Sequence, residues 1–260
     1  MGSQPPKLSG AITDVGRVRS NNEDTFLLRP DLGLWLVADG MGGHQSGGVA
    51  SAMVRLSVGD FFEVTGNGVA WDEAFVDPAD ADLPRAARRL LASIRKANHD
   101  VFEASGDHAR AQGMGSTVVA CHIDEEEPYR MHIAHVGDSR CYRIRDRKLE
   151  LLTSDHSLVN EARALDPSMT EEELSRLPQN IITRALGMES SVEVDVGSVE
   201  IEKGDTFLLC SDGLSGLLST DEMLEAIALV DDAKEACEVL VAMANEAGGI
   251  DNITALALKV

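Results

Sequence analysis

Short apolar stretches of this chain repeatedly end or begin at an aspartate, and this pattern constrains the fold more than any other feature. Asp39 ends LWLVADG, Asp138 ends HIAHVGDS and Asp212 ends TFLLCSDG. Asp251 opens DNITALALKV, and Asp24 in NNED directly precedes TFLL. A turn would explain any one of them, since Asp-Gly and Asp-Asn are common turn sequences. Together they predict that buried strands place several carboxylates at sheet edges.

A cluster of carboxylates held by buried strands repels itself unless cations lie between its members. Oxygen donors without a neighbouring set of His or Cys side chains favour magnesium or manganese over zinc. The acidic run DPADAD at Asp77–Asp82 lacks the loop glycine and terminal glutamate of an EF-hand, so it indicates a solvated loop. The strand-end aspartates therefore predict a magnesium or manganese site.

Composition limits the classes of partner. The 260 residues carry a formal net charge of -21, which argues against general affinity for nucleic acid or anionic membranes. No apolar stretch reaches 18 residues, and the N-terminal MGSQPPKLSG does not have the pattern of a signal peptide. We therefore expect a cytoplasmic protein, and we also expect it to be a monomer. None of the cysteines forms a CxxC pair, and we expect all four to be buried and reduced: Cys121, Cys141, Cys210 and Cys237.

Periodicity and turn sequences predict the elements. We expect strands at 26–29, 34–38, 116–123, 130–136, 140–144, 149–152, 192–196, 206–210 and 253–260. We expect helices at 49–62, 84–103, 171–177, 221–229 and 233–246, the third and fourth begun by capping boxes. Groups of strands separated by helices imply mixed layers of helix and sheet rather than a regular parallel fold. The order of elements alone does not fix the architecture.

Two further features point to phosphate chemistry. Arg19 precedes Asp24 in RSNNED, and a guanidinium there could hold two phosphate oxygens, although Arg17 competes for the same role. The glycines of DGMGGHQSGG are followed by no Gly-Lys-Ser/Thr, which excludes a Walker loop. They could let the backbone approach closely, so that the carbonyl of Gly40 joins the shell of a metal. A flexible turn is the alternative.

The motifs RSNNED, LVADGMGGH, MGST, HVGDSR, ITRALG, LLCSDGL and GGIDNIT occur in this order along nearly the whole chain. In order and separation the set resembles the metal-dependent (type 2C) protein serine/threonine phosphatases in their compact bacterial form. The resemblance implies an α+β fold, a four-layer α-β-β-α sandwich of two antiparallel sheets flanked by helices, with a metal cleft at one edge. It also implies one phosphatase domain at 13–260 after an N-terminal extension at 1–12, with a flap inserted at about 154–187.

The resemblance assigns roles to individual residues. Asp39 would bridge two tightly bound Mn²⁺ or Mg²⁺ ions, and Gly40 would offer its carbonyl to one of them. Asp212 and Asp251 would hold the other, and Asp138 would join Asp212 at a third, weaker ion. Arg19 matches the arginine that binds the substrate phosphate. Three further residues would support the metals and their water: Glu23, Asp24 and Asn252.

The implied reaction is hydrolysis of phosphoserine and phosphothreonine in proteins by a metal-activated water, in opposition to a bacterial Ser/Thr kinase. One position departs from the family. Animal members have a His, proposed as the general acid, directly after the metal-binding Asp-Gly, and here that residue is Met41. His44 follows three residues later, but nothing in the sequence makes it a substitute. The general acid therefore stays unassigned.

Three alternatives stay open at this point. Cys141 and Arg147 have the C-x5-R spacing of a cysteine-dependent phosphatase, although the intervening YRIRD is typical of a strand and turn. A catalytically silent phosphatase fold could act only as a binding module, but such proteins usually lose the metal carboxylates, which are all present here. A phosphatase of small molecules is the third.

Overall fold

The computed structural model describes residues 8–42, 46–66, 75–107 and 113–260. In the first sheet the strands are β2 (Asp24–Arg29), β3 (Leu34–Met41), β4 (Gly115–Ser116), β5 (Val118–His122), β6 (Arg130–Val136) and β9 (Asp195–Glu200). In the second they are β1 (Leu8–Asp14), β7 (Arg140–Arg145), β8 (Lys148–Leu151), β10 (Thr206–Cys210) and β11 (Ile253–Lys259). The strand orders are β2-β3-β5-β6-β9, with β4 beside β3, and β1-β11-β10-β7-β8. Every pairing is antiparallel.

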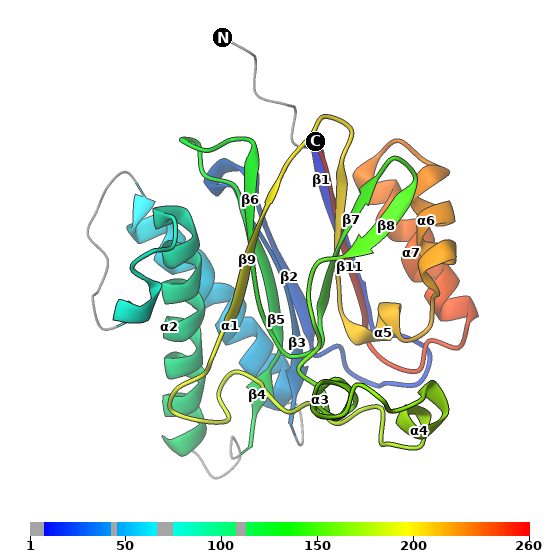
Figure 1. Ribbon diagram of the computed structural model, residues 1–260, viewed down its shortest axis with the longest axis horizontal. Helices are drawn as coiled ribbons and strands as arrows, with labels where there is room; N and C mark the ends of the chain where they lie inside the picture. Colours follow the sequence, from blue (N-terminus) through cyan, green and yellow to red (C-terminus); the bar gives the residue numbers. More distant parts are fainter. Residues whose placement is uncertain (1–7, 43–45, 67–74, 108–112) are drawn as a thin grey trace.

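Helices cover the outer face of each sheet (Figure 1). The first sheet is covered by α1 (Ser46–Val64) and α2 (Arg85–Asp107), and the second by α6 (Thr220–Ala228) and α7 (Ala233–Glu246). Two short helices, α3 (Leu158–Leu165) and α4 (Glu171–Ser175), lie across one end of the sandwich, and α5 (Asp212–Ser215) follows β10. The predicted α-β-β-α sandwich is confirmed.

The central strands are apolar throughout because both of their faces are buried. In β3, Leu34 and Leu36 pack into the core beneath α1 and α2, whereas Trp35 and Val37 pack into the core between the two sheets. Successive side chains of a strand point to opposite faces, so a strand between two cores needs apolar residues at every position. The runs LWLVA, TFLLC and ITALAL have this composition.

Several predicted elements differ from the observed ones. Residues 8–12, expected in an extension outside the domain, lie in β1, which pairs with β11. The strand expected at 192–196 is β9 at Asp195–Glu200, and the one expected at 116–123 is divided into β4 and β5. The segment 154–187 contains α3 as well as the predicted α4. Both predicted capping boxes are present, at the starts of α4 and α6.

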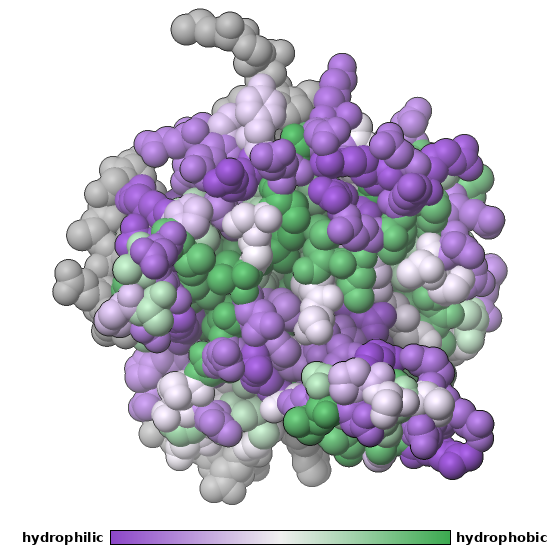
Figure 2. Space-filling model, viewed as in Figure 1, coloured by the Kyte–Doolittle hydropathy of each residue, from purple (hydrophilic) through white to green (hydrophobic). Residues whose placement is uncertain are grey.

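The face in Figure 2 is polar over most of its area, with apolar side chains gathered along the middle, between the edge strands β9 and β8. Leu152 and Val199 are partly buried and pack against the core between the sheets. Among the described residues, no helix is long and apolar enough to cross a membrane.

Candidate active site

The predicted aspartates come together at one end of the sandwich, the lower end in Figure 1. Asp24 opens β2 and lies directly opposite Asp39, near the end of β3. Asp212 begins α5 directly after β10, and Asp251 lies just before β11. Asp138 lies in the turn between β6 and β7. The two sheets therefore both contribute carboxylates to the same end.

The electrostatic environment of Asp39 shows that these carboxylates form one cluster. Burial raises the pKa of Asp39 well above its ordinary value, and the charges of Asp24, Asp212, Asp138 and Asp251 raise it further. Burial, with repulsion from Asp212, also raises the pKa of Asp138 to about 7. The pKa of Asp24 is raised to about 6, chiefly by burial. Cations would relieve this accumulated repulsion.

Unpartnered oxygens provide a separate test of whether cations fit here. Oδ1 of Asp24, of Asp138 and of Asp212 is buried in each case and accepts no hydrogen bond from the described part of the chain. A buried acceptor without a partner costs about 1–3 kcal/mol, and an anionic one costs more. Carboxylate oxygens left open in this way are the donors that Mg²⁺ and Mn²⁺ prefer. The residues present therefore fit the predicted metal centre.

Arg19 pairs with one of the predicted metal ligands. Its Nη2 donates to Oδ2 of Asp251 over 2.8 Å, and the side chain of Arg19 is 54% exposed. The hydrogen bond to Asp251 raises the pKa of Arg19, and the charges of Asp39 and Asp212 act in the same direction. Within the described residues, no three of the aspartates bring carboxylate oxygens within 4.8 Å of one another. The guanidinium thus lies at the exposed rim of a cluster that is spread out rather than closed around one point.

Asn252 ties the loop that carries Arg19 to the start of β11. Its Nδ2 donates to the carbonyl oxygens of Val15 at 3.0 Å and Asn21 at 2.9 Å. Its Oδ1 accepts from the backbone N–H of Glu23 at 2.8 Å. The side chain of Asn252 is buried, so these hydrogen bonds fix the loop to the interior of the protein. The supporting role expected for Asn252 thus has a defined set of contacts.

Two glycines allow α1 to begin against the end of β3. A Cβ at Gly40 would lie 2.0 Å from the carbonyl oxygen of Gly47, and one at Gly47 would lie 2.6 Å from the carbonyl oxygen of Gly40. The N–H of Gly40 also donates to the carbonyl of Glu23 at 3.1 Å, and the N–H of Gly48 donates to Oε1 of Glu23 at 3.4 Å. Close approach of the backbone, rather than a flexible turn, explains these glycines.

Hydroxyl groups that the sequence analysis left without a role support Asp39. The backbone N–H of Asp39 donates to Oγ1 of Thr117 at 3.1 Å, and Oγ of Ser116 lies within hydrogen-bond distance of the carbonyls of Asp39 at 3.0 Å and Thr117 at 2.7 Å. Thr117 Oγ1 is also hydrogen-bonded to Oγ of Ser139, beside Asp138, at 2.7 Å. The backbone of Asp39 is therefore linked through Thr117 to the side chain of Ser139, the residue after Asp138. Ser116 and Thr117 belong to the MGST motif, but the residues that they contact, Asp39 and Ser139, are distant in sequence.

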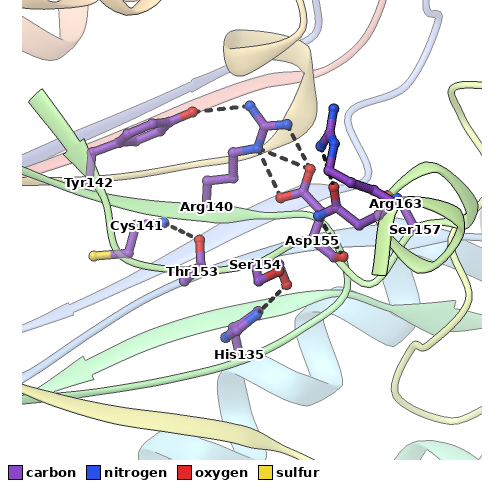
Figure 3. A network of polar contacts seen from close by, with 10 residues as sticks. His135, Arg140, Cys141, Tyr142, Thr153, Ser154, Asp155, Ser157 and Arg163 are labelled. Atoms are coloured by element: carbon purple, nitrogen blue, oxygen red, sulfur yellow. Dashed lines mark hydrogen bonds and ion pairs between the residues drawn. The ribbon is translucent and has the colours of Figure 1, made fainter. Parts of the chain in front are cut away.

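The start of the segment 154–187, the predicted flap, is fixed to β7 by Arg140 (Figure 3). The guanidinium of Arg140 donates from Nε to Oδ1 of Asp155 at 2.9 Å and from Nη2 to Oδ2 at 2.6 Å. Its Nη1 reaches the hydroxyl of Tyr142 at 3.2 Å. A bidentate pair of this kind fixes direction as well as distance. The first residues of the flap are therefore held at the same end of the sandwich as Asp138.

His156 holds the turn next to Asp138. Its Nδ1 accepts from the N–H of Gly137 at 3.0 Å, and its own backbone N–H donates to the carbonyl of Gly137 at 2.9 Å. Because Nδ1 accepts, a neutral His156 ring carries its proton on Nε2. Neither Arg140 nor His156 was predictable as part of the site, because both act through contacts between the segment 154–187 and the sheets.

His135, His156 and Asp195 form a group whose possible ligand atoms lie within 4.8 Å of one another. The two rings are stacked, with centroids 4.8 Å apart and planes inclined by 16°. Their lone pairs lie in nearly parallel planes and so do not converge on one ion. Nη1 of Arg184 is 2.8 Å from Oδ1 of Asp195 and 3.1 Å from Nε2 of His156, and it already supplies a positive charge. The group ties the flap to β9 rather than offering an open metal site.

Met41 occupies the position at which animal members of the family have a histidine. Its thioether has no proton to donate. Met41 lies at the end of β3 and lines a cavity of about 430 Å³ together with apolar, polar and charged residues, among them Ile182, Arg184 and Glu189. His44 lies outside the described residues. The chain therefore has a side chain without an acidic proton at this position, in a cavity whose lining is both polar and apolar.

Cys141 does not have the surroundings of a nucleophile. It is completely buried in β7, and its Sγ lies 3.7 Å from Sγ of Cys121. The hydrogen bond to Cys121 and burial raise the pKa of the Cys141 thiol well above its ordinary value. Arg147 lies in the turn after β7, with a φ of 57°. The thiolate reading of the C-x5-R spacing has no phosphate loop to support it.

Comparison with known proteins agrees with this geometry. Residues 17–249 match the family described as protein phosphatase 2C. Protein phosphatase PhpP of Streptococcus pneumoniae serotype 2 (strain D39) is 37% identical over 248 residues, which cover 94% of this chain and 93% of the relative. The solved S. agalactiae serine/threonine phosphatase has a TM-score of 0.82 and 34% identity, and the alignment covers 98% of this chain and 100% of that one.

A second solved structure is the catalytic domain of the serine/threonine protein phosphatase PstP in complex with two manganese ions. It has a TM-score of 0.79 and 30% identity, with 97% of each chain covered. A sandwich of this topology with a carboxylate cluster at one end, together with relatives of this similarity, defines a protein phosphatase. More particularly, the chain belongs to the protein phosphatase 2C family.

Proposed function

We propose that this protein hydrolyses phosphoserine and phosphothreonine in proteins, with Mn²⁺ or Mg²⁺ held by the strand-end aspartates. The observation that carries the proposal is the gathering of Asp24, Asp39, Asp138, Asp212 and Asp251 from both sheets at one end of the sandwich. Three of these carboxylates leave a buried oxygen open. The relatives named as serine/threonine phosphatases, and the two manganese ions of PstP, support the same reading.

Each residue has a proposed role in holding the metals. Asp39 would bridge two ions, with the carbonyl of Gly40 on one of them and Asp212 and Asp251 on the other. Asp138 and Asp212 would hold a third, weaker ion. Bound divalent cations supply a water of lowered pKa and positive charge opposite the phosphoryl oxygens.

The remaining chemistry belongs to the side chains. Arg19 would leave Asp251 and donate to two oxygens of the phosphoryl group, which orients the phosphorus for in-line attack. Glu23 and Asp24 would fix the orientation of the attacking water by accepting its hydrogen bonds. Met41 has no proton to donate, so we propose that water protonates the leaving alkoxide.

The direct experiment is hydrolysis of a phosphothreonine peptide with Mn²⁺, with and without EDTA, beside an Asp212→Asn variant. We expect turnover that requires Mn²⁺ and is lost in both controls. Turnover that resists EDTA would contradict the metal assignment. Binding of Mn²⁺ by the wild-type protein without any turnover would favour a catalytically silent binding module over the enzyme. Low-molecular-weight phosphoesters assayed in parallel would reveal a preference for small molecules.

We further propose that one phosphatase domain carries the whole activity, with the flap at 154–187 beside the site, and that it acts as a monomer in the cytoplasm. The unpaired thiols of Cys121 and Cys141, in contact at 3.7 Å, suit a reducing compartment. Its substrates would be a Ser/Thr kinase and the proteins that the kinase modifies. Loss of the phosphatase gene should raise phosphothreonine on these proteins, and size-exclusion chromatography with light scattering should give the monomer mass.

A further inference from the structure

One oxygen of Asp24 is held by two buried hydroxyl groups. Oγ of Ser211 and Oγ1 of Thr254 both donate to Oδ2 of Asp24, each at 2.7 Å. Ser211 and Thr254 are completely buried, and Asp24 is 8% exposed. The other oxygen of Asp24, Oδ1, accepts no hydrogen bond from the described residues. The two oxygens of this carboxylate are therefore in different situations.

The contacts behind these hydroxyls have only one consistent set of proton positions. Thr254 gives its single hydroxyl proton to Asp24, so it accepts at its 2.7 Å contact with Oγ1 of Thr13. Thr13 must then donate to Thr254, and its own oxygen accepts from Nδ2 of Asn22 at 2.8 Å. Ser211 Oγ likewise accepts from the backbone N–H of Thr254 at 3.0 Å. Each group in this series of hydrogen bonds donates to the next one, and the series ends at Oδ2 of Asp24.

This chain of donors runs from the surface to the interior and crosses between the two sheets. Asn22 is exposed, Thr13 is partly buried and Thr254 is completely buried. Asp24 belongs to β2 of the first sheet, whereas Thr13 and Thr254 are directly opposite each other on β1 and β11 of the second. A carboxylate on one sheet is thus oriented by hydroxyls on the other.

Two donors on one oxygen prevent the carboxylate from exchanging its oxygens by rotation, because rotation would break both bonds. Aligned hydroxyl dipoles also polarise one another, which strengthens each bond. Oδ1 is therefore the oxygen left without a donor among the described residues, on a residue that lies directly opposite Asp39 and is affected by the charge of Asp212. Oδ2 is thus held in place by two hydrogen bonds, and Oδ1 is an acceptor without a donor among the described residues.

We propose that the chain Asn22–Thr13–Thr254 and the Ser211 hydroxyl orient Asp24 for the cations, so that Thr13 and Thr254 are positioning residues for metal binding. This inference rests on the proposed metal centre. It assigns an effect on metal affinity to Thr13, a residue that touches neither Asp24 nor any of the proposed ligands in the described contacts and acts only through Thr254.

The test is Mn²⁺ affinity measured by isothermal titration calorimetry on the wild-type protein and four variants. Thr254→Val keeps the shape of the side chain but removes the hydroxyl, and we expect it to weaken Mn²⁺ binding at least fivefold. Thr13→Val should weaken it two- to fivefold. Thr254→Ser, which keeps the donor, should bind within twofold of wild type. Thr206→Val is the matched control, because Thr206 is buried at the opposite end of β10, and its affinity should be unchanged.

Thermal unfolding in EDTA shows which variants are folded and separates orientation from simple stability. A purely structural role predicts a lower unfolding temperature with unchanged Mn²⁺ affinity in both valine variants, and that result would overturn the inference. If Thr254→Val does not fold, Thr13→Val, at a partly exposed site, decides alone. Failure of the wild-type protein to bind Mn²⁺ would instead remove the proposed metal centre itself.

Discussion

Arg19 and Asp251 are separated by 231 intervening residues and form an ion pair in which Nη2 and Oδ2 are 2.8 Å apart. The pair joins the proposed phosphate-binding side chain to a proposed metal ligand. In the absence of metal, the guanidinium partly offsets the charge that cations would otherwise neutralise. Arg19 therefore has two competing partners, the carboxylate and the substrate phosphate.

Removal of Arg19 should separate these two interactions. We expect Arg19→Ala to raise KM for a phosphothreonine peptide about tenfold, because an Arg–phosphate contact is worth on the order of 1–3 kcal/mol. The same variant should bind Mn²⁺ as tightly as wild type or a few-fold more tightly, since Asp251 loses its competing partner. Steady-state kinetics and calorimetry measure the two effects. Arg17→Ala is the matched control, because the only hydrogen bond described for Arg17 is from its backbone N–H to Gly249. Equal effects of both variants would contradict the assignment of Arg19.

The acidic cluster should make the metal-free protein less stable as pH rises. The pKa of Asp138 is raised to about 7 from an ordinary value of 3.8, and that of Asp24 to about 6. A raised pKa in the folded state stabilises the protein at low pH, and this contribution is lost as pH rises from about 4 through 7. The unfolding free energy in EDTA, measured with urea, should therefore be lower at pH 8 than at pH 5.

Asp138→Asn isolates the local part of this effect from the general repulsion of a chain with a net charge of -21. At pH 8 in EDTA the variant should be more stable than wild type by about 1–3 kcal/mol, and at pH 4 the difference should vanish. The same change in stability at both pH values would show that Asp138 is not titrating against its neighbours.

Cys141→Ala should retain most of the activity. The side chain is completely buried beside Cys121, so its loss should cost only about 1–2 kcal/mol of stability through the small cavity that it leaves. Phosphopeptide turnover at saturating Mn²⁺ measures the outcome. A loss of turnover beyond a hundredfold in a folded variant would revive the cysteine mechanism.

Gly137→Ala should disturb both Asp138 and the support of Asp39. The φ of Gly137 is 102°, and a Cβ there would lie 2.6 Å from the side chain of Thr117. We expect a loss of about 1–3 kcal/mol in stability together with a large loss of Mn²⁺-dependent turnover. Gly204→Ala is a matched control, because its φ is 95° but no atom lies within 4 Å of the added Cβ. The control should lose stability and keep its turnover; parallel losses of turnover would refute the role of the Thr117 contact.

The elements with a strong local pattern were predictable from the sequence. The strands at Arg130–Val136 and Thr206–Cys210 and the helix at Ala233–Glu246 have the predicted bounds, because each is an apolar or amphipathic run with clear turn residues at its ends. The aspartates were predictable for the same reason, since each one ends or precedes such a run. The arrangement of the strands came only from the resemblance, because periodicity does not state which strands pair.

Elements whose pattern depends on distant contacts were missed. Gly10 interrupts the pattern of β1, yet it is a glycine because a Cβ there would lie 2.4 Å from the backbone nitrogen of Lys234 in α7. Gly197 lies inside β9, which extends past it to Glu200. The helix α3 was missed although Leu158, Ala162 and Leu165 recur at helical spacing, and none of its side chains is fully buried. Arg140 and Asp155 could not be paired from sequence, since nothing local joins β7 to the flap.

The position of β11 has a consequence for the synthesis of the chain. This strand lies between β1 and β10 and carries Asp251 just before its first residue. Until residues 253–259 have left the ribosome, β1 has no neighbour in its sheet and β10 has one open edge. Before that point the nascent protein therefore has an open edge on an apolar strand, and it cannot gather all of its carboxylates. Ion capture becomes one of the last events of biogenesis, and a chain interrupted before β11 would be left without a working centre.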